Sequence, residues 1–111
     1  MRTIERSTAF KRDFKRERRG RYRDEIKAIT TEIIHRLVLD ESLDPKFRDH
    51  DLVGNYRGYR ECHVRPDLLL IYKKVGNDVL RLARMGSHLT TGQNQNNPLE
   101  VIGVMREMEV E

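Results

Sequence analysis

Residues 59–85, YRECHVRPDLLLIYKKVGNDVLRLARM, decide the fold of this chain. Residues 59–65 alternate between an apolar and a polar side, which is typical of a strand with one covered face. Residues 68–72 are apolar on both faces, as in a central strand. A turn signal at residues 76–78 leads into residues 79–85, which read as a further strand. The polar side of the first strand carries Tyr59, Glu61, His63 and Arg65.

Two amphipathic segments precede these strands. Ser7 is a typical N-cap ahead of Phe10 and Phe14, which lie four residues apart on one face of a helix. Gly20 is a natural end for that helix. The apolar residues of 22–38 recur at steps of three and four, which predicts a second helix of about five turns.

Short strands are expected at residues 2–6 and 50–53, on either side of the two helices. The order of one strand, two helices and several antiparallel strands predicts an α+β fold. We expect both helices to pack on one face of a mainly antiparallel sheet of four to five strands, with the other face open. The domain should span residues 1–88, followed by a polar linker and a C-terminal helix within residues 89–111.

Charge and length restrict the class of partner. The chain has 111 residues, which suits one domain, and a net charge of +4 with a pI near 9.5. A basic protein of this kind is expected to bind an anionic partner, and composition alone leaves RNA, DNA, acidic protein and phospholipid open.

The positive charge is concentrated in residues 11–23, where Asp13 and Glu17 offset it only in part. Such a segment is either a solvated helix face or a surface that follows a phosphate backbone. The candidate RNA- and ribosome-binding residues are Lys11, Arg12, Lys15, Arg16, Arg18, Arg19, Arg21 and Arg23.

The single cysteine and the charged N-terminus indicate the compartment. Cys62 has no cysteine to pair with, which suits a reducing cytosol. The first 20 residues are too charged for the apolar core of a signal peptide, and the longest apolar run, residues 68–72, is too short to span a membrane. We therefore expect a cytoplasmic protein with no membrane partner.

Three of the four histidines, His50, His63 and His88, lie in the strand-rich half. With Cys62 they could supply zinc ligands, but no spacing typical of a zinc site is present. Cys62 and His63 are also adjacent, so on a strand they point to opposite faces. We expect neither a metal nor another cofactor.

Metal-free RNA cleavage requires a base for the ribose 2′-hydroxyl, an acid for the departing 5′-oxygen and a cation for the phosphate. Imidazole suits the proton transfers and guanidinium suits the phosphate. Asp67 could orient a histidine or contact a base, although an aspartate after proline is most often a turn residue. The candidate catalytic residues are His50, His63, Asp67, Arg84 and His88.

A family resemblance strengthens this interpretation. Residues 48–67, RDHDLVGNYRGYRECHVRPD, resemble the YafQ-type toxins of the RelE superfamily, whose pattern is roughly D-H-x-L-x-G-x-[WY]-x-G-Y-R-[DE]-x-H-[VI]-x-P-D. LIYK at 70–73 and RMGSH at 84–88 continue the match. The resemblance covers residues 1–88 and is most specific from residue 48 onward.

The resemblance implies a type II toxin that cleaves messenger RNA in the ribosomal A site without a metal. His88 would be the leading acid or base, with His50 and His63 in support, and Arg84 would stabilise the transition-state phosphate. The basic segment would bind ribosomal RNA. The implied partners are the ribosome, mRNA and a cognate antitoxin, typically a dimeric DNA-binding protein.

Two departures from the family pattern concern the substrate base. Leu68 replaces a common tryptophan, and no aromatic residue follows His88, where relatives usually have one. Base stacking on an aromatic contributes roughly 1–3 kcal/mol.

The alternative to a nuclease is a non-catalytic protein on the same fold that acts by binding an antitoxin or, as in the ParE kind, gyrase. The histidine set favours the nuclease.

Overall fold

A computed structural model describes residues 1–53 and 57–87 of the chain. His88 and the linker and helix predicted within residues 89–111 lie outside these residues. The elements in chain order are β1 (Thr3–Arg6), α1 (Thr8–Glu17), α2 (Ile26–Val38), the 3-10 turn η1 (Pro45–Phe47), β2 (His50–Asp51), β3 (Tyr59–Arg65), β4 (Leu68–Val75) and β5 (Val79–Gly86).

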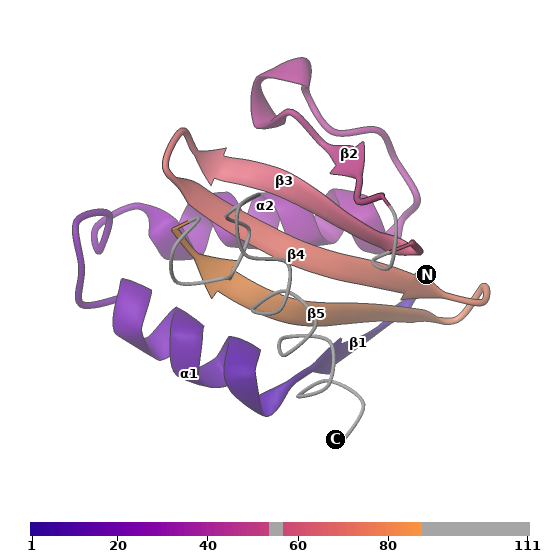
Figure 1. Cartoon of the computed structure of the whole chain (residues 1–111), viewed down its shortest axis with the longest axis horizontal. Coiled ribbons are helices and arrows are strands. Elements are labelled where there is room, and N and C mark those ends of the chain that lie inside the picture. The colour runs from indigo at the N-terminus through magenta and orange to yellow at the C-terminus, as the bar shows by residue number, and fades with distance from the viewer. Residues whose placement is uncertain (54–56, 88–111) are drawn as a thin grey trace.

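The strands form one sheet in the order β1-β5-β4-β3-β2. β1 is parallel to β5, and the other three pairings are antiparallel. Figure 1 shows α2 behind the sheet and α1 beside β5 and β1. The predicted α+β class and the mainly antiparallel sheet are therefore confirmed.

The main core lies between the helices and one face of the sheet. Its helical side includes Phe10 of α1 and Ile33 and Leu37 of α2, and its sheet side includes Leu70 and Leu82. These side chains are almost completely buried. Full burial of each one contributes roughly 1.5–3 kcal/mol, which explains why the apolar stripes of both helices face the sheet.

A smaller cluster covers part of the opposite face. Tyr59, Ile71 and Ala83 are buried there, with Leu52 packed against them. Residues 68–72 are apolar on both sides because β4 contributes to both clusters. In residues 1–53 and 57–87, the face predicted to be open therefore carries an apolar cluster of its own.

The second helix starts later than its sequence pattern predicts. α2 begins at Ile26 rather than at Tyr22, although the N–H groups of Glu25 and Ile26 both donate to the Tyr22 carbonyl. The Tyr22 hydroxyl is bound by Asp67, in the turn between β3 and β4. Tyr22 thus continues the apolar period of the helix while a tertiary contact holds it in the preceding turn.

Two strand predictions also need correction. β2 has two residues rather than the four expected over 50–53. Arg65 does not share the open face with His63, because the register shifts between them. Its guanidinium pairs with Glu25 at 2.5 Å and lies 5.8 Å from the centre of the Tyr22 ring, on the helical side.

No helix within the described part of the chain is long and apolar enough to cross a membrane.

Candidate active site

Strand register brings candidate site residues into one row across the sheet. His50 of β2 pairs with Glu61 of β3, Glu61 with Ile71 of β4, and Ile71 with Arg84 of β5. Directly paired residues point to the same face of a sheet. Ile71 belongs to the cluster on the face opposite the helices, so this row lies on that face.

A buried carboxylate of this row, that of Glu61, lies between two imidazoles, His50 of the same row and His63 two residues further along β3. The Glu61 Oε1 atom is 3.5 Å from Nε2 of His50 and 3.8 Å from Nε2 of His63. The two rings have centroids 6.3 Å apart. The Glu61 side chain is only 5% exposed, whereas those of His50 and His63 are 50% and 13% exposed.

Backbone carbonyls define the tautomers of both rings. Nδ1 of His50 is 2.7 Å from the Arg48 carbonyl oxygen, and Nδ1 of His63 is 3.3 Å from that of Pro66. A carbonyl oxygen only accepts, so Nδ1 carries the proton in each ring. Nε2 is then the atom that gains or loses a proton, and when protonated it can donate to Glu61.

Glu61 is a functional candidate that sequence reasoning missed. It lies two residues before His63 on the same strand, so both side chains project from one face. That spacing and the acidic position in the family pattern were the available signals. Only the fold shows that the carboxylate is shared with His50.

Arg84 is held by a buried carboxylate on α1. Its Nε donates to Asp13 Oδ2 at 2.6 Å and its Nη2 to Asp13 Oδ1 at 3.3 Å. Asp13 is completely buried, and the Arg84 side chain is 12% exposed. Arg84 lies two strands from Glu61 in the register row, which corresponds to about 10 Å at the usual strand spacing.

Asp67 lies at the end of the sheet, in the turn between β3 and β4. The Tyr22 hydroxyl donates to its carboxylate, and Arg21 pairs with it at 3.2 Å. The Tyr22 bond lowers the pKa of Asp67, and the same bond raises the pKa of Tyr22. These contacts turn the carboxylate towards the connection between α1 and α2, so they give no support to a role in orienting a histidine.

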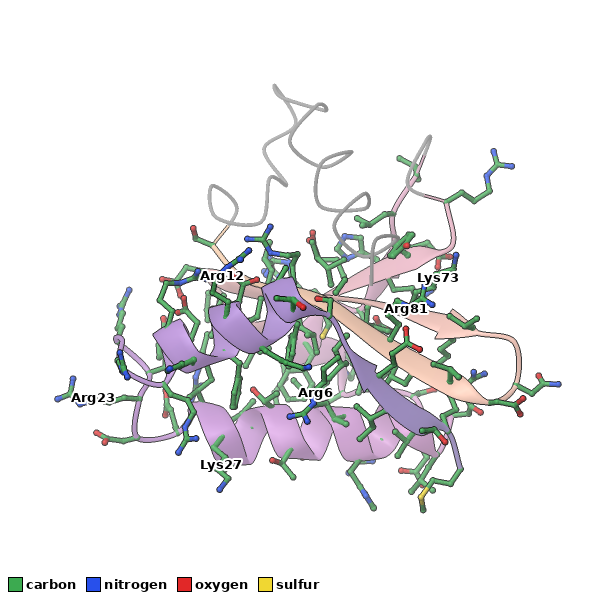
Figure 2. The ribbon with its side chains drawn as sticks, turned by 90° about the horizontal axis from the view of Figure 1, so that it is seen from below. Arg6, Arg12, Arg23, Lys27, Lys73 and Arg81 are labelled. Atoms are coloured by element: carbon green, nitrogen blue, oxygen red, sulfur yellow. The ribbon has the colours of Figure 1, made fainter. Side chains whose placement is uncertain are left out.

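The predicted basic surface is divided between exposed and structural side chains. Arg16 donates to Asp13 and to the Met85 carbonyl oxygen, both at 3.0 Å, so it joins α1 to β5. A groove of about 440 Å³ beside Phe10 and Phe14 is lined by Arg6, Lys11, Lys15, Arg18 and Arg19. Figure 2 shows Arg6, Arg12 and Arg23 around the helices, and Lys73 and Arg81 over the strands.

A second cavity opens beside His63. It has a volume of about 290 Å³ and lies between α2, η1 and the end of β3. Its lining combines apolar and charged side chains: Ile29, Glu32, Lys46, Phe47, Arg48, His63, Val64, Arg65 and Pro66. Within residues 1–53 and 57–87, no three His, Cys, Asp or Glu side chains converge as metal ligands would.

Fold and site together define a small α+β protein with two imidazoles on either side of a buried carboxylate, and with a basic helix. The family model described as bacterial toxin of type II toxin-antitoxin system, YafQ, matches residues 2–91. The mRNA interferase toxin YafQ of Escherichia coli K12 is 35% identical over 78% of this chain and 91% of its own length. The chain belongs to the YafQ family of bacterial type II toxins.

Solved structures agree with this family. YafQ from E. coli BL21(DE3) is 31% identical with a TM-score of 0.68, over 80% of this chain and 96% of its own. YafQ in the E. coli DinJ-YafQ complex is 34% identical with a TM-score of 0.64, over 80% of this chain and 96% of its own. A metal-bound toxin from Helicobacter pylori is 36% identical with a TM-score of 0.69, over 80% of this chain and 97% of its own.

Proposed function

We propose that this chain is an endoribonuclease that cleaves mRNA on the ribosome by attack of the ribose 2′-hydroxyl, with proton transfer by imidazole rather than by a metal. The observation that carries the proposal is the Glu61 carboxylate between two imidazoles whose Nδ1 atoms both face backbone carbonyls. The mRNA interferase named among the relatives supports the substrate class.

The reaction needs two proton transfers. One imidazole Nε2 takes the proton of the 2′-hydroxyl, and the oxygen attacks the adjacent phosphorus. The bond to the 5′-oxygen breaks, and that oxygen receives a proton from a second imidazole. The products are a 2′,3′-cyclic phosphate and a free 5′-hydroxyl. His88 is proposed as the leading acid or base, with His50 and His63 as the supporting groups.

Two charged side chains would stabilise this reaction. Glu61 offsets the positive charge on an imidazole that has taken a proton, since its carboxylate is within 4 Å of both rings. Arg84 supplies positive charge for the phosphoryl oxygens. Asp67 is proposed to act by holding the turn that contains Pro66, whose carbonyl oxygen accepts a hydrogen bond from His63 Nδ1–H.

The cavity beside His63 is the proposed place for a nucleotide that flanks the scissile phosphate. Its apolar walls can contact a base, and Arg48 and Lys46 can approach a phosphate. This space is relevant because no aromatic residue follows His88 in this chain. The chain can therefore contact the base with Phe47, Pro66 and their neighbours.

The exposed basic side chains of α1 and the following turn are the proposed contact with ribosomal RNA. A groove with five cations and no acidic residue in its lining attracts a phosphate backbone. Within the predicted set, Arg16 and Arg21 already have protein partners: Arg16 is bonded to Asp13 and to the Met85 carbonyl, and Arg21 pairs with Asp67.

The partner that controls this activity is proposed to be an antitoxin. The E. coli relative crystallises as a DinJ-YafQ toxin-antitoxin complex, which supports a partner of that kind here. A dimeric, DNA-binding antitoxin that covers the imidazole face would block access to His50. The site of action is the cytoplasm, where translating ribosomes are.

The test maps RNA 5′ ends in translating ribosomes and in naked RNA, with a chelator selective for transition metals so that ribosomes keep their Mg²⁺. Cleavage should persist in the chelator and fall by about 10²–10⁴ in His63→Ala and His88→Ala. The control is His35→Ala, an exposed histidine on α2. Growth arrest without new RNA ends, unchanged by His88→Ala, would instead indicate a toxin that acts by protein binding.

A further inference from the structure

On its side away from β4, the end of β5 is bonded by side chains rather than by a neighbouring strand. β1 pairs with β5 only as far as Arg6 and Leu82. Beyond that point the Ser7 hydroxyl donates to the Ala83 carbonyl at 2.6 Å. The Met85 N–H donates to Asp13 at 3.0 Å. Buried backbone groups need partners, and α1 with its N-cap supplies them where β1 has ended.

Asp13 is the centre of this arrangement. Its buried carboxylate accepts from the Met85 N–H, from Arg16 at 3.0 Å, and from two nitrogens of Arg84. A buried carboxylate is tolerated only with such charge-assisted bonds. Asp13 also lies three residues after Phe10 and one before Phe14, so it occupies the inward stripe of α1.

We propose that Asp13 is a positioning residue for RNA cleavage, because its carboxylate orients the Arg84 guanidinium and fixes the end of β5. This inference rests on the proposed function, in which Arg84 stabilises the phosphate. Asp13 is completely buried, so it cannot touch RNA, and its charge would repel a phosphate. Its effect on the reaction must therefore pass through the groups it binds, which are Arg84, Met85 and Arg16.

Preorganisation of the Arg84 side chain explains why its contacts with Asp13 affect the rate of cleavage. A free arginine side chain samples many rotamers, and ordering it during the reaction would oppose catalysis. With Nε and Nη2 both bound to Asp13, the plane of the guanidinium is defined before substrate arrives. The same carboxylate accepts from the Met85 N–H, so one side chain both orients Arg84 and fixes the end of β5.

The main test compares Asp13→Asn with Glu5→Gln. Glu5 is the matched control, since it also pairs with an arginine of β5, Arg81, at 2.5 Å, but on the exposed part of the strand. Cleavage kinetics on ribosomes give kcat and KM separately. Asp13→Asn should lower kcat by about 10- to 100-fold with less than about a threefold change in KM. Glu5→Gln should leave both unchanged.

A double-mutant cycle shows whether Asp13 acts through Arg84. In an Arg84→Ala background, adding Asp13→Asn should lower kcat by less than about threefold further. A further loss as large as in the wild-type background would overturn the proposal, as would an Asp13→Asn protein that keeps wild-type kcat. A KM increase that accounts for the whole effect would overturn it equally.

A spectroscopic readout separates this proposal from the proposed function. The Arg84 Nε–H should give a resolved, slowly exchanging NMR signal in the wild-type protein, and Asp13→Asn should abolish it. If wild-type protein makes no cuts, the proposed function fails while this signal still reports on the pairing.

If Asp13→Asn does not fold, Arg84→Lys replaces it. Lysine keeps the positive charge but cannot make the two-nitrogen contact, so kcat should fall at least about tenfold. Wild-type kcat in Arg84→Lys would refute the positioning role.

Discussion

Replacing Tyr72 with phenylalanine removes one hydroxyl from a buried network that supports β2. Tyr72 lies in the middle of β4 and is completely buried. Its hydroxyl donates to Asp49 and accepts from Arg60 Nε at 3.2 Å. Asp49 directly precedes His50, and Arg60 also pairs with Asp51. The network thus joins Asp51 of β2 and Asp49, the residue before β2, to the centre of the sheet.

The magnitude follows from the charge and exposure of the partners. Burial, together with the bond to Asp49, raises the pKa of Tyr72, so the hydroxyl stays protonated at neutral pH. A hydrogen bond to a charged group contributes about 1.5–3 kcal/mol. Asp49 and Arg60 remain bonded to each other at 2.9 Å and are partly exposed, so neither is left isolated. We expect Tyr72→Phe to lower the free energy of unfolding by about 1.5–2 kcal/mol.

The assay is urea unfolding at neutral pH followed by circular dichroism, with a thermal melt in parallel. For a domain of this size the expected decrease corresponds to a drop in Tm of about 10 °C. The matched control is Tyr22→Phe, because the Tyr22 hydroxyl also donates to an aspartate, Asp67, but at the surface. It should leave the unfolding midpoint unchanged.

Two results would refute this reasoning. A loss below about 0.5 kcal/mol in Tyr72→Phe would mean that water replaces the hydroxyl without penalty. Equal losses in Tyr72→Phe and Tyr22→Phe would mean that burial does not decide the strength of these bonds. Either result would remove the network as the anchor of β2.

Three further predictions concern charge and burial. Neutralising Lys15, Arg18 and Arg19, three exposed cations of the basic groove, should weaken ribosome binding in a sedimentation assay, with the largest loss at low salt. Unchanged binding would exclude the groove as the contact with ribosomal RNA. Hydrogen bonds from Lys74 and Arg2 lower the pKa of Asp40 to about 2, so this carboxylate stabilises the fold above about pH 4 and loses that effect as the pH falls to about 2. Asp40→Asn should therefore lower the urea midpoint at neutral pH, and its difference from wild type should vanish near pH 2. Burial raises the pKa of Cys62, so a thiol reagent should modify it only in urea, and rapid modification of the folded protein would contradict its place in the core.

The strand region could be predicted in detail from sequence. Alternation over Tyr59–Arg65, the apolar run that begins β4 and the turn at 76–78 are local signals, and the strands lie where these signals place them. The same holds for the inward face of α1, because Phe10 and Phe14 are one helical turn apart. Local periodicity reports burial well wherever a segment has one covered side.

The site was only partly predictable. Alternation placed His63 on the open face, and His50 was a candidate as another histidine of the strand-rich half, which β2 brings beside His63. The role of Glu61 between the rings depends on pairing between two strands, and the contact of Asp67 with Tyr22 depends on a turn packed against a distant loop. A single residue carries no signal for such partners.

From the sequence alone came the class of fold, the positions of the strands, the basic character of the first helix and the family. These depend on side-chain periodicity, turn residues and charge, all of which act over a few neighbouring positions. The tertiary structure alone decided which charges neutralise one another. Asp13 and Arg84 are 71 residues apart, and only the packing of α1 on β5 brings them within 2.6 Å. In the sequence, Asp13 only offsets part of the positive charge of a basic helix. In the folded protein its carboxylate is buried and needs hydrogen-bond donors, so it becomes an anchor for the site.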